Sequence, residues 1–72
     1  MVRWGVLGAG SVAQRRVMPA LNANPECRIE ALMVRDPERA AQLAGEFDAA
    51  RHYHRVDDLL ADPEIDAVYV SS

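Results

Sequence analysis

A short glycine-rich segment near the start of the chain carries the clearest chemical signal in the sequence. It follows the apolar run Val2–Leu7 and reads Gly8-Ala9-Gly10-Ser11-Val12-Ala13. The first glycine permits a tight turn, the second lets the main chain approach a ligand, and the alanine lets a following helix pack closely. The N–H groups that open such a helix lack internal partners and bind phosphate. We therefore predict that a dinucleotide binds through its diphosphate at Gly8, Gly10, Ser11, Val12 and Ala13.

Two other interpretations of this segment remain. A glycine-rich turn can simply join a strand to a helix. A methyltransferase loop for an S-adenosyl ligand also follows the first strand of a doubly wound sheet, but it does not need a small residue at Ala13. The strand before the glycines and the helix after them favour dinucleotide binding.

The end of the second apolar run, residues 28–34, indicates which dinucleotide binds. Domains that bind NAD place an acidic residue there, which accepts a hydrogen bond from the ribose 2′-hydroxyl. Val34 occupies that position and Arg35 follows it; a guanidinium pairs with a 2′-phosphate, so NADP is favoured over NAD. Alternatively, Asp36 is the ribose acid, or Arg35 is only a solvated residue at a strand end. We favour Asp36 as the N-cap of a helix that begins at Pro37.

Other polar residues in the sequence could contact a ligand or a metal. Ser71 ends the last apolar run, and ligands of open α/β sheets lie beyond such strand ends, so we expect Ser71 to approach the cofactor. Ser72 is better explained as a frayed end. His52 and His54 point to the same side of a strand, but no third ligand has suitable spacing, so we predict no metal site. Asp57 and Asp58 are expected to stabilise a helix N-terminus, and no catalytic residue is assigned.

The elements that must hold these residues alternate between strands and helices. We expect strands at residues 2–7, 28–34, 51–54 and 65–72. Helices are expected from Ser11 with an apolar stripe of Ala13, Val17, Ala20 and Leu21, and from Asp36 with a stripe of Ala40, Leu43, Ala44 and Phe47. One or two further helical turns are expected at residues 57–60.

This order, β-α-β-α-β-α-β, predicts an α/β fold with a doubly wound parallel sheet and helices on both faces. A complete dinucleotide-binding domain has about six strands, so the sheet is expected to be incomplete. Pro19 should bend the first helix, and Gly45 lies near the end of the second. Trp4 should share one side of the first strand with Val2 and Val6.

Composition narrows the classes of partner. Eleven acidic residues against eight basic ones give a net charge of −3, which does not favour binding of nucleic acid. All eight basic residues are arginine, so no amine is present for a Schiff base or for proton transfer. The single cysteine, Cys27, fits a reduced compartment. No apolar run approaches the ~18 residues of a membrane span, and we expect a cytoplasmic protein.

Several motifs together resemble one known family. They are Arg3-Trp4-Gly5-Val6-Leu7-Gly8-Ala9-Gly10, Met18-Pro19-Ala20-Leu21, Arg35-Asp36-Pro37-Glu38-Arg39-Ala40 and Asp66-Ala67-Val68-Tyr69-Val70. In this order they resemble the N-terminal Rossmann domain of the Gfo/Idh/MocA family, which includes glucose-fructose oxidoreductase and inositol dehydrogenase. The resemblance spans the whole chain and identifies no substrate.

The resemblance implies an NAD(P)-dependent oxidoreductase of sugars, polyols or related small carbonyl compounds. It also implies a second, α+β domain for the substrate, and a lysine in a Glu-Lys-Pro motif that serves in proton transfer. We expect residues 1–72 to form the N-terminal part of the nucleotide-binding domain, to lack the C-terminal substrate domain and to be inactive alone. We expect the parent protein to be a homo-oligomer. The alternative is a non-catalytic dinucleotide-binding sensor or regulatory module.

Overall fold

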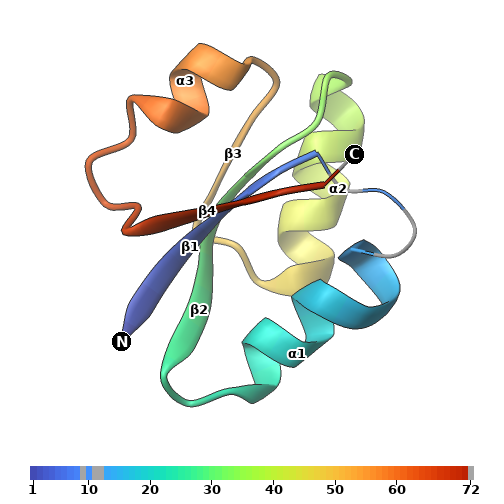
Figure 1. The fold of residues 1–72 in the computed structure, drawn as a ribbon. Helices are drawn as coiled ribbons and strands as arrows, with labels where there is room; N and C mark the ends of the chain where they lie inside the picture. Colours follow the sequence, from blue (N-terminus) through green and yellow to red (C-terminus); the bar gives the residue numbers. More distant parts are fainter. Residues whose placement is uncertain (9, 11–12, 72) are drawn as a thin grey trace.

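Strands and helices alternate along the chain, as Figure 1 shows for the computed structural model, which describes residues 1–8, 10 and 13–71. The strands are β1 (Val2–Leu7), β2 (Cys27–Met33), β3 (Arg51–Tyr53) and β4 (Ala67–Val70). The helices are α1 (Met18–Ala23), which continues a π-helical turn η1 (Ala13–Val17), then α2 (Pro37–Phe47) and α3 (Val56–Leu60). The predicted order of elements is therefore confirmed. Within the described residues, no helix is both long and apolar enough to cross a membrane.

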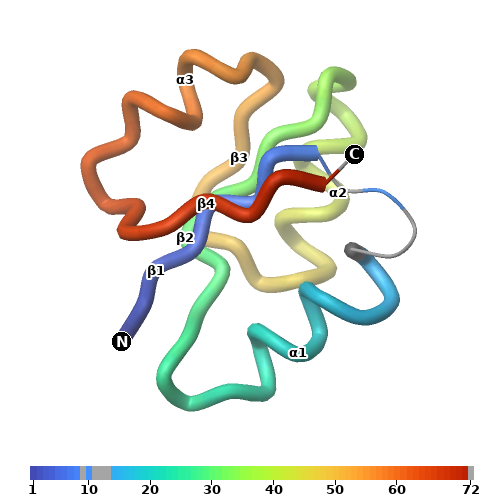
Figure 2. The backbone as a smooth tube through the Cα atoms, viewed as in Figure 1, coloured from blue at the N-terminus to red at the C-terminus, as the bar shows by residue number. Residues whose placement is uncertain are grey.

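The strands form one parallel sheet in the order β3-β2-β1-β4. The chain moves outward from β1 through β2 to β3, then returns to the other side of β1, where β4 runs beside it (Figure 2). Crossovers in opposite directions along a sheet place their helices on opposite faces. Accordingly, α1 and α2 cover one face and α3 covers the other (Figure 1). The predicted doubly wound sheet is confirmed.

Each face of the sheet has its own apolar core. The core under α1 and α2 consists of Val6, Met18, Ile29, Leu32, Ala40, Leu43 and Ala44. The core under α3 consists of Ala31, Met33 and Leu59. The predicted stripe of α2 is therefore buried, with Phe47 packed against the edge of its core. The α3 face has fewer buried side chains, so apolar burial stabilises it less.

The first helix differs from the prediction in the side chain that it buries. Met18 is fully buried, whereas Ala20, part of the predicted stripe, is exposed. The cause is η1, because a π-helical turn has i to i+5 hydrogen bonds and rotates later side chains away from the 3.6-residue spacing. Pro19 lies next to this turn, at the second residue of α1, and its missing N–H removes one helical hydrogen bond where the regular helix is already interrupted.

The central strand β1 is buried mainly in its second half. Of the three residues predicted to share one side, Val6 is fully buried, Trp4 is half-buried and Val2 is exposed. The indole N–H of Trp4 is buried and has no hydrogen-bond partner in the described part of the chain. On the other side of β1, a Cβ at Gly5 would lie 2.9 Å from Cδ1 of Ile65, so glycine permits close packing there.

The second helix begins where the sequence predicts. Oδ1 of Asp36 accepts a hydrogen bond from the Glu38 N–H at 3.0 Å, and Pro37 is the first helical residue. Gly45 lies near the other end, but the helix continues to Phe47. The left-handed residue that follows is Asp48, with φ of 60°. A short polar side chain tolerates this conformation better than most, so a glycine is not required.

An ionic clamp joins the starts of β1 and β4. The Arg3 guanidinium donates to both carboxylate oxygens of Asp66 at 3.0 Å, and also pairs with Glu64. Main-chain bonds run in both directions, from Arg3 N to Asp66 Oδ2 at 2.9 Å and from Asp66 N to Arg3 O at 2.8 Å. The hydrogen bonds from Arg3 hold the pKa of Asp66 below its ordinary value. The clamp fixes the register of β4 on β1.

A second polar network lies on the α3 face. In the pairing of β2 with β1, Ile29 lies opposite Trp4 and Ala31 opposite Gly5, which leaves Glu30 as an extra residue. Glu30 is buried, and its carboxylate pairs with Arg51 at 3.1 Å and with Arg28 at 3.1 Å. This irregularity in β2 has no signal in the apolar pattern of residues 28–34.

Arg51 extends the network to the segment before β4. Its guanidinium donates to Asp62 at 2.7 and 3.2 Å, and the Tyr53 hydroxyl donates to the same carboxylate at 2.8 Å. These bonds lower the pKa of Asp62 from 3.8 to about 2; the one from Arg51 has the largest effect, and burial opposes the shift. The network ties β2 and β3 to the turn that leads into β4.

We expect Asp62→Asn to lower the free energy of unfolding by about 2 kcal/mol at neutral pH, because Arg51 and Tyr53 lose a charged hydrogen-bond acceptor. The carboxylate stabilises the fold fully above its ordinary pKa of 3.8, and this stabilisation is lost as the pH falls through about 2. Chemical unfolding between about pH 4 and about pH 2 measures this loss of stability in the native protein. In Asp62→Asn, the part of the pH dependence that comes from this carboxylate should be absent. Asp58→Asn, at an exposed position of α3, is the matched control. An unchanged acid profile in Asp62→Asn would contradict the assignment.

We also expect this chain to self-associate when it is studied alone. β4 is an edge strand, and Val68 and Val70 on it are exposed, as is Leu60 on α3. Exposed edges and apolar patches promote association. Light scattering against concentration tests this, and Val70→Lys should reduce the association. A monodisperse monomer at all concentrations would refute the prediction.

Candidate functional site

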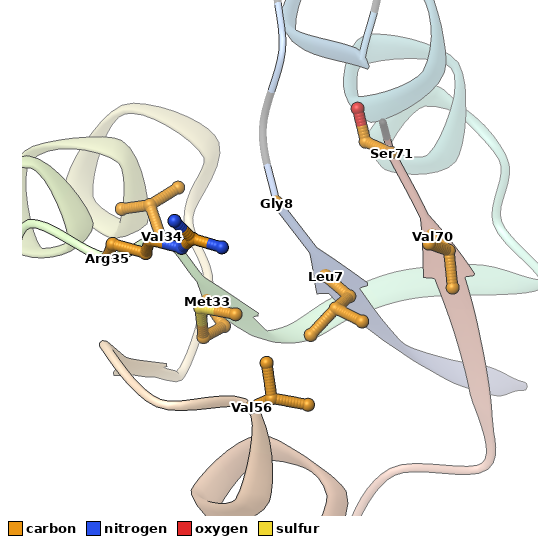
Figure 3. A pocket seen from close by; sticks show the side chains of 8 residues that line it. All are labelled: Leu7, Gly8, Met33, Val34, Arg35, Val56, Val70 and Ser71. Atoms are coloured by element: carbon orange, nitrogen blue, oxygen red, sulfur yellow. The ribbon is translucent and has the colours of Figure 1, made fainter.

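The candidate site is a cavity at the carboxyl ends of β1, β2 and β4. It has a volume of about 360 Å³ and is lined by Leu7, Gly8, Met33, Val34, Arg35, Val56, Val70 and Ser71. Figure 3 shows these residues around the three strand ends, with Val56 at the start of α3. The strand order reverses between β1 and β4, and open α/β sheets bind ligands at such a reversal.

Four of the residues predicted to bind the cofactor line this cavity: Gly8, Val34, Arg35 and Ser71. They come from three separate parts of the sequence. The sheet brings them together because β1 lies between β2 and β4 and all three strands run parallel.

Gly8 occupies a position that requires glycine. Its φ is +80°, and a Cβ built there would lie 2.8 Å from the main-chain oxygen of Ser71. Its N–H donates to the Met33 carbonyl at 2.8 Å, which continues the hydrogen bonding between β1 and β2 beyond the last strand residue. The turn therefore passes close to the end of β4, as only a residue without a side chain can.

Gly10 is exposed and lies three residues before η1. Its N–H donates to Oγ of Ser71 at 3.3 Å, and its carbonyl accepts from the Gln14 N–H at 3.0 Å. Ser11 and Val12 are also predicted to bind the diphosphate, and they lie outside the residues that the structure describes. The backbone of Ala13 opens η1, as a residue at the start of the helix should.

The end of β2 supplies the side of the cavity where Arg35 lies. Val34 is half-buried against the α1 and α2 core, and its N–H donates to the Tyr53 carbonyl at 3.2 Å. Arg35 is exposed and lines the cavity. Asp36, the alternative ribose ligand, caps α2 through Oδ1 and is not among the described residues that line the cavity.

Arg39, on the first turn of α2, connects the two helices beside the cavity. Its guanidinium donates to Oε1 of Gln14 at 3.2 Å. This contact joins α2 to the helix that follows the glycine turn. Spacing along the sequence gives no indication of it, because the partners are on different helices.

Apart from Val34, the apolar lining of the cavity was not predicted. Leu7, Met33 and Val70 are the last residues of their strands, so the strand ends themselves were the available signal. Val56 comes from α3, and nothing local in the sequence places it there. The side chains of Val56 and Val70 remain 41% and 67% exposed, which gives the cavity an apolar surface open to a ligand.

The other polar residues weighed in the sequence lie outside the cavity lining. His52 and His54 are both exposed, and no group of three or more metal-ligating side chains occurs among the described residues. Asp57 and Asp58 lie in the first turn of α3, as expected. This position favours acidic side chains through the helix dipole.

The sequence matches a known family profile and several proteins of that family. The profile for the Gfo/Idh/MocA oxidoreductase family, with an NAD-binding Rossmann fold, matches residues 2–72. The chain is 45% identical over 71 residues to a dTDP-3,4-didehydro-2,6-dideoxy-alpha-D-glucose 3-reductase of Saccharopolyspora spinosa, covering 96% of this chain. It is 36% identical over 67 residues to D-xylose 1-dehydrogenase (NADP(+)) 2 of Haloferax volcanii, covering 93% of this chain.

Solved structures give the same result. A 3-ketoreductase from Actinomadura kijaniata in complex with NADP superposes on 99% of this chain with a TM-score of 0.93 and 34% identity. The chain spans about a fifth of the length of these relatives: 20% of the two enzymes and 22% of the ketoreductase. The similarity therefore concerns one part of each relative.

We expect Gly8→Ala to lower the free energy of unfolding by about 2 kcal/mol, because the new Cβ meets both a positive φ and the Ser71 carbonyl. Gly45→Ala is the matched control. Nothing lies within 4 Å of the Cβ position at Gly45, so alanine there should stabilise α2 by about 0.5–1 kcal/mol. Denaturant unfolding of both variants measures the difference. Equal effects of the two substitutions would show that the close approach at Gly8 is not constrained.

Proposed function

This chain belongs to the Gfo/Idh/MocA oxidoreductase family, and on that premise we propose that its cavity binds the adenosine half of NADP. The observation that carries the proposal is the position of the glycine turn. It lies at the reversal of strand order, beside a cavity that opens between β1, β2 and β4. The two features together fit a nucleotide whose diphosphate crosses the turn.

In this proposal the main chain of the glycine segment binds the diphosphate. The residues concerned are Gly8, Gly10, Ser11, Val12 and Ala13. The Gly8 N–H already donates to the Met33 carbonyl, so Gly8 contributes through its missing side chain rather than through its amide. Amides that open a helix offer donors and a partial positive charge, and both favour a phosphate group. The absence of a side chain at Gly8 keeps the approach from the cavity open.

The apolar lining is suited to the adenine ring. Leu7, Val56 and Val70 present aliphatic surface where the sheet edge meets α3 (Figure 3). A flat aromatic ring in this space removes exposed apolar area from water. The volume of about 360 Å³ lies at the small end of the range for ligand pockets, about 300–1,000 Å³. That size suits one half of a dinucleotide.

Arg35 is proposed to select the phosphorylated cofactor. It is exposed at the rim, next to Val34, which has no carboxylate to repel a 2′-phosphate. A guanidinium binds phosphate with two parallel hydrogen bonds and stacks on aromatic rings. The names of two relatives support this choice, since NADP is the coenzyme of the xylose dehydrogenase and the bound ligand of the ketoreductase.

For the whole protein we propose hydride transfer to or from a sugar or related small carbonyl compound. NADP supplies or accepts the hydride. Because this chain contains no lysine, proton transfer of the kind implied by the family resemblance needs groups outside residues 1–72. We therefore propose that residues 1–72 are the N-terminal part of the cofactor domain and are inactive alone. We also propose a cytoplasmic homo-oligomer, a location that the free thiol of Cys27 suits.

Calorimetric titration with four ligands tests this proposal: NADP, NAD, 2′,5′-ADP and nicotinamide mononucleotide. We expect NADP to bind at least about tenfold more tightly than NAD, which corresponds to about 1.4 kcal/mol. We expect 2′,5′-ADP to bind and the mononucleotide not to bind. Arg35→Ala should remove the preference for NADP, because the contact with the 2′-phosphate, which NAD lacks, is lost.

Arg28→Ala is the matched control for that variant. Arg28 lies near the start of β2, far along the strand from the cavity, and should leave both affinities unchanged within about twofold. Tighter binding of NAD than of NADP would overturn the choice of cofactor. Failure of all four ligands to bind would overturn the proposed function.

A further inference from the structure

One side chain at the cavity already contacts the glycine turn. Oγ of Ser71 accepts a hydrogen bond from the Gly10 N–H at 3.3 Å, across 61 residues of sequence. Gly10 belongs to the segment proposed to hold the diphosphate, and Ser71 lines the cavity (Figure 3). The turn after the first strand and the end of the last strand therefore meet at the site.

The position of Ser71 is fixed by its neighbours. Its N–H donates to the Leu7 carbonyl at 2.9 Å, which extends the pairing of β4 with β1 by one residue. The missing side chain at Gly8 leaves space for the Ser71 carbonyl, which lies 2.8 Å from the Cβ position there. The hydroxyl thus projects from a strand end whose main chain is hydrogen-bonded to β1 and lies close to Gly8.

A hydroxyl can serve both the turn and a bound phosphate at once. It has two acceptor lone pairs and one proton to donate. Accepting from Gly10 leaves that proton free, whereas a diphosphate at neutral pH offers only acceptors. Hydrogen bonds to an ionised acceptor are stronger than those between neutral groups. The contact with Gly10 and a contact with the diphosphate are therefore compatible.

We propose that Ser71 is a positioning residue, whose hydroxyl holds the Gly10 amide in place before the cofactor arrives and then donates its own proton to the diphosphate. This inference rests on the proposed function. The benefit is pre-organisation, because a turn that is already ordered loses less conformational entropy on binding. A second contact restrains the chain just after this segment, because the Arg39 guanidinium donates a hydrogen bond to Gln14 in η1.

Two measurements on Ser71→Ala test the proposal. The first is the exchange rate of the Gly10 amide with water, by NMR without ligand, and we expect it to rise at least about fivefold. The second is the dissociation constant for NADP by calorimetry, and we expect it to rise about five- to tenfold. Ser71→Thr retains the hydroxyl and should restore both values to within about twofold of the native protein.

Val68→Ala is the matched control. Val68 lies on the same edge strand, three residues before Ser71, and pairs with Gly5 away from the turn. It should leave the exchange of Gly10 and the affinity for NADP unchanged. A circular dichroism spectrum and unfolding curve for each variant confirm that it is folded before the comparison is made.

The outcomes separate this inference from the proposed function. If the native protein does not bind NADP, the proposed function fails, while the exchange rate of Gly10 still decides whether Ser71 holds the turn. If NADP binds and Ser71→Ala binds it equally well or more tightly, the hydroxyl does not assist binding and the inference is overturned. An unchanged Gly10 exchange rate in Ser71→Ala also overturns it.

Discussion

The pairing of β4 with β1 is the constraint on which the candidate site depends. After three strands laid down in one direction, the chain crosses back and adds β4 on the other side of β1. Two strand ends from opposite ends of the sequence then flank the glycine turn, and the cavity lies between them and the end of β2. Without this reversal, Ser71 and Val70 would be far from Gly8.

The two faces of the sheet are stabilised by different means. Among the residues whose burial is described, the core under α1 and α2 has seven buried apolar residues, whereas the core under α3 has three. On the thinner face, ionic contacts connect the segment before β4 to the rest of the sheet: Arg3 with Asp66, and Arg51 with Asp62. Exposed ion pairs contribute little, but the nearly buried Asp62 makes its network costly to break. These contacts support the placement of β4.

Local signals in the sequence were sufficient for the order of elements and for four of the residues that line the cavity. Gly8, Val34, Arg35 and Ser71 were identified from their places at strand ends, and all four line the cavity. The start of α2 was equally clear, since an Asp-Pro pair acts through bonds to its own neighbours. The burial of Met18 was missed because a π-helical turn changes the helical spacing, and the apolar periodicity assumed a regular helix.

The sequence by itself determined which segments become strands and helices, where a glycine turn follows a strand, and that Arg35 rather than an acid follows Val34. The strands, helices and turn follow from features of residues close together in the chain, namely turn conformation, helix capping and apolar periodicity. Only the tertiary structure decided that Val56 and Val70 line one cavity, that Glu30 is the extra residue in β2, and that Ser71 contacts Gly10. Those contacts join residues far apart in sequence, and packing of the whole sheet is what brings them within reach.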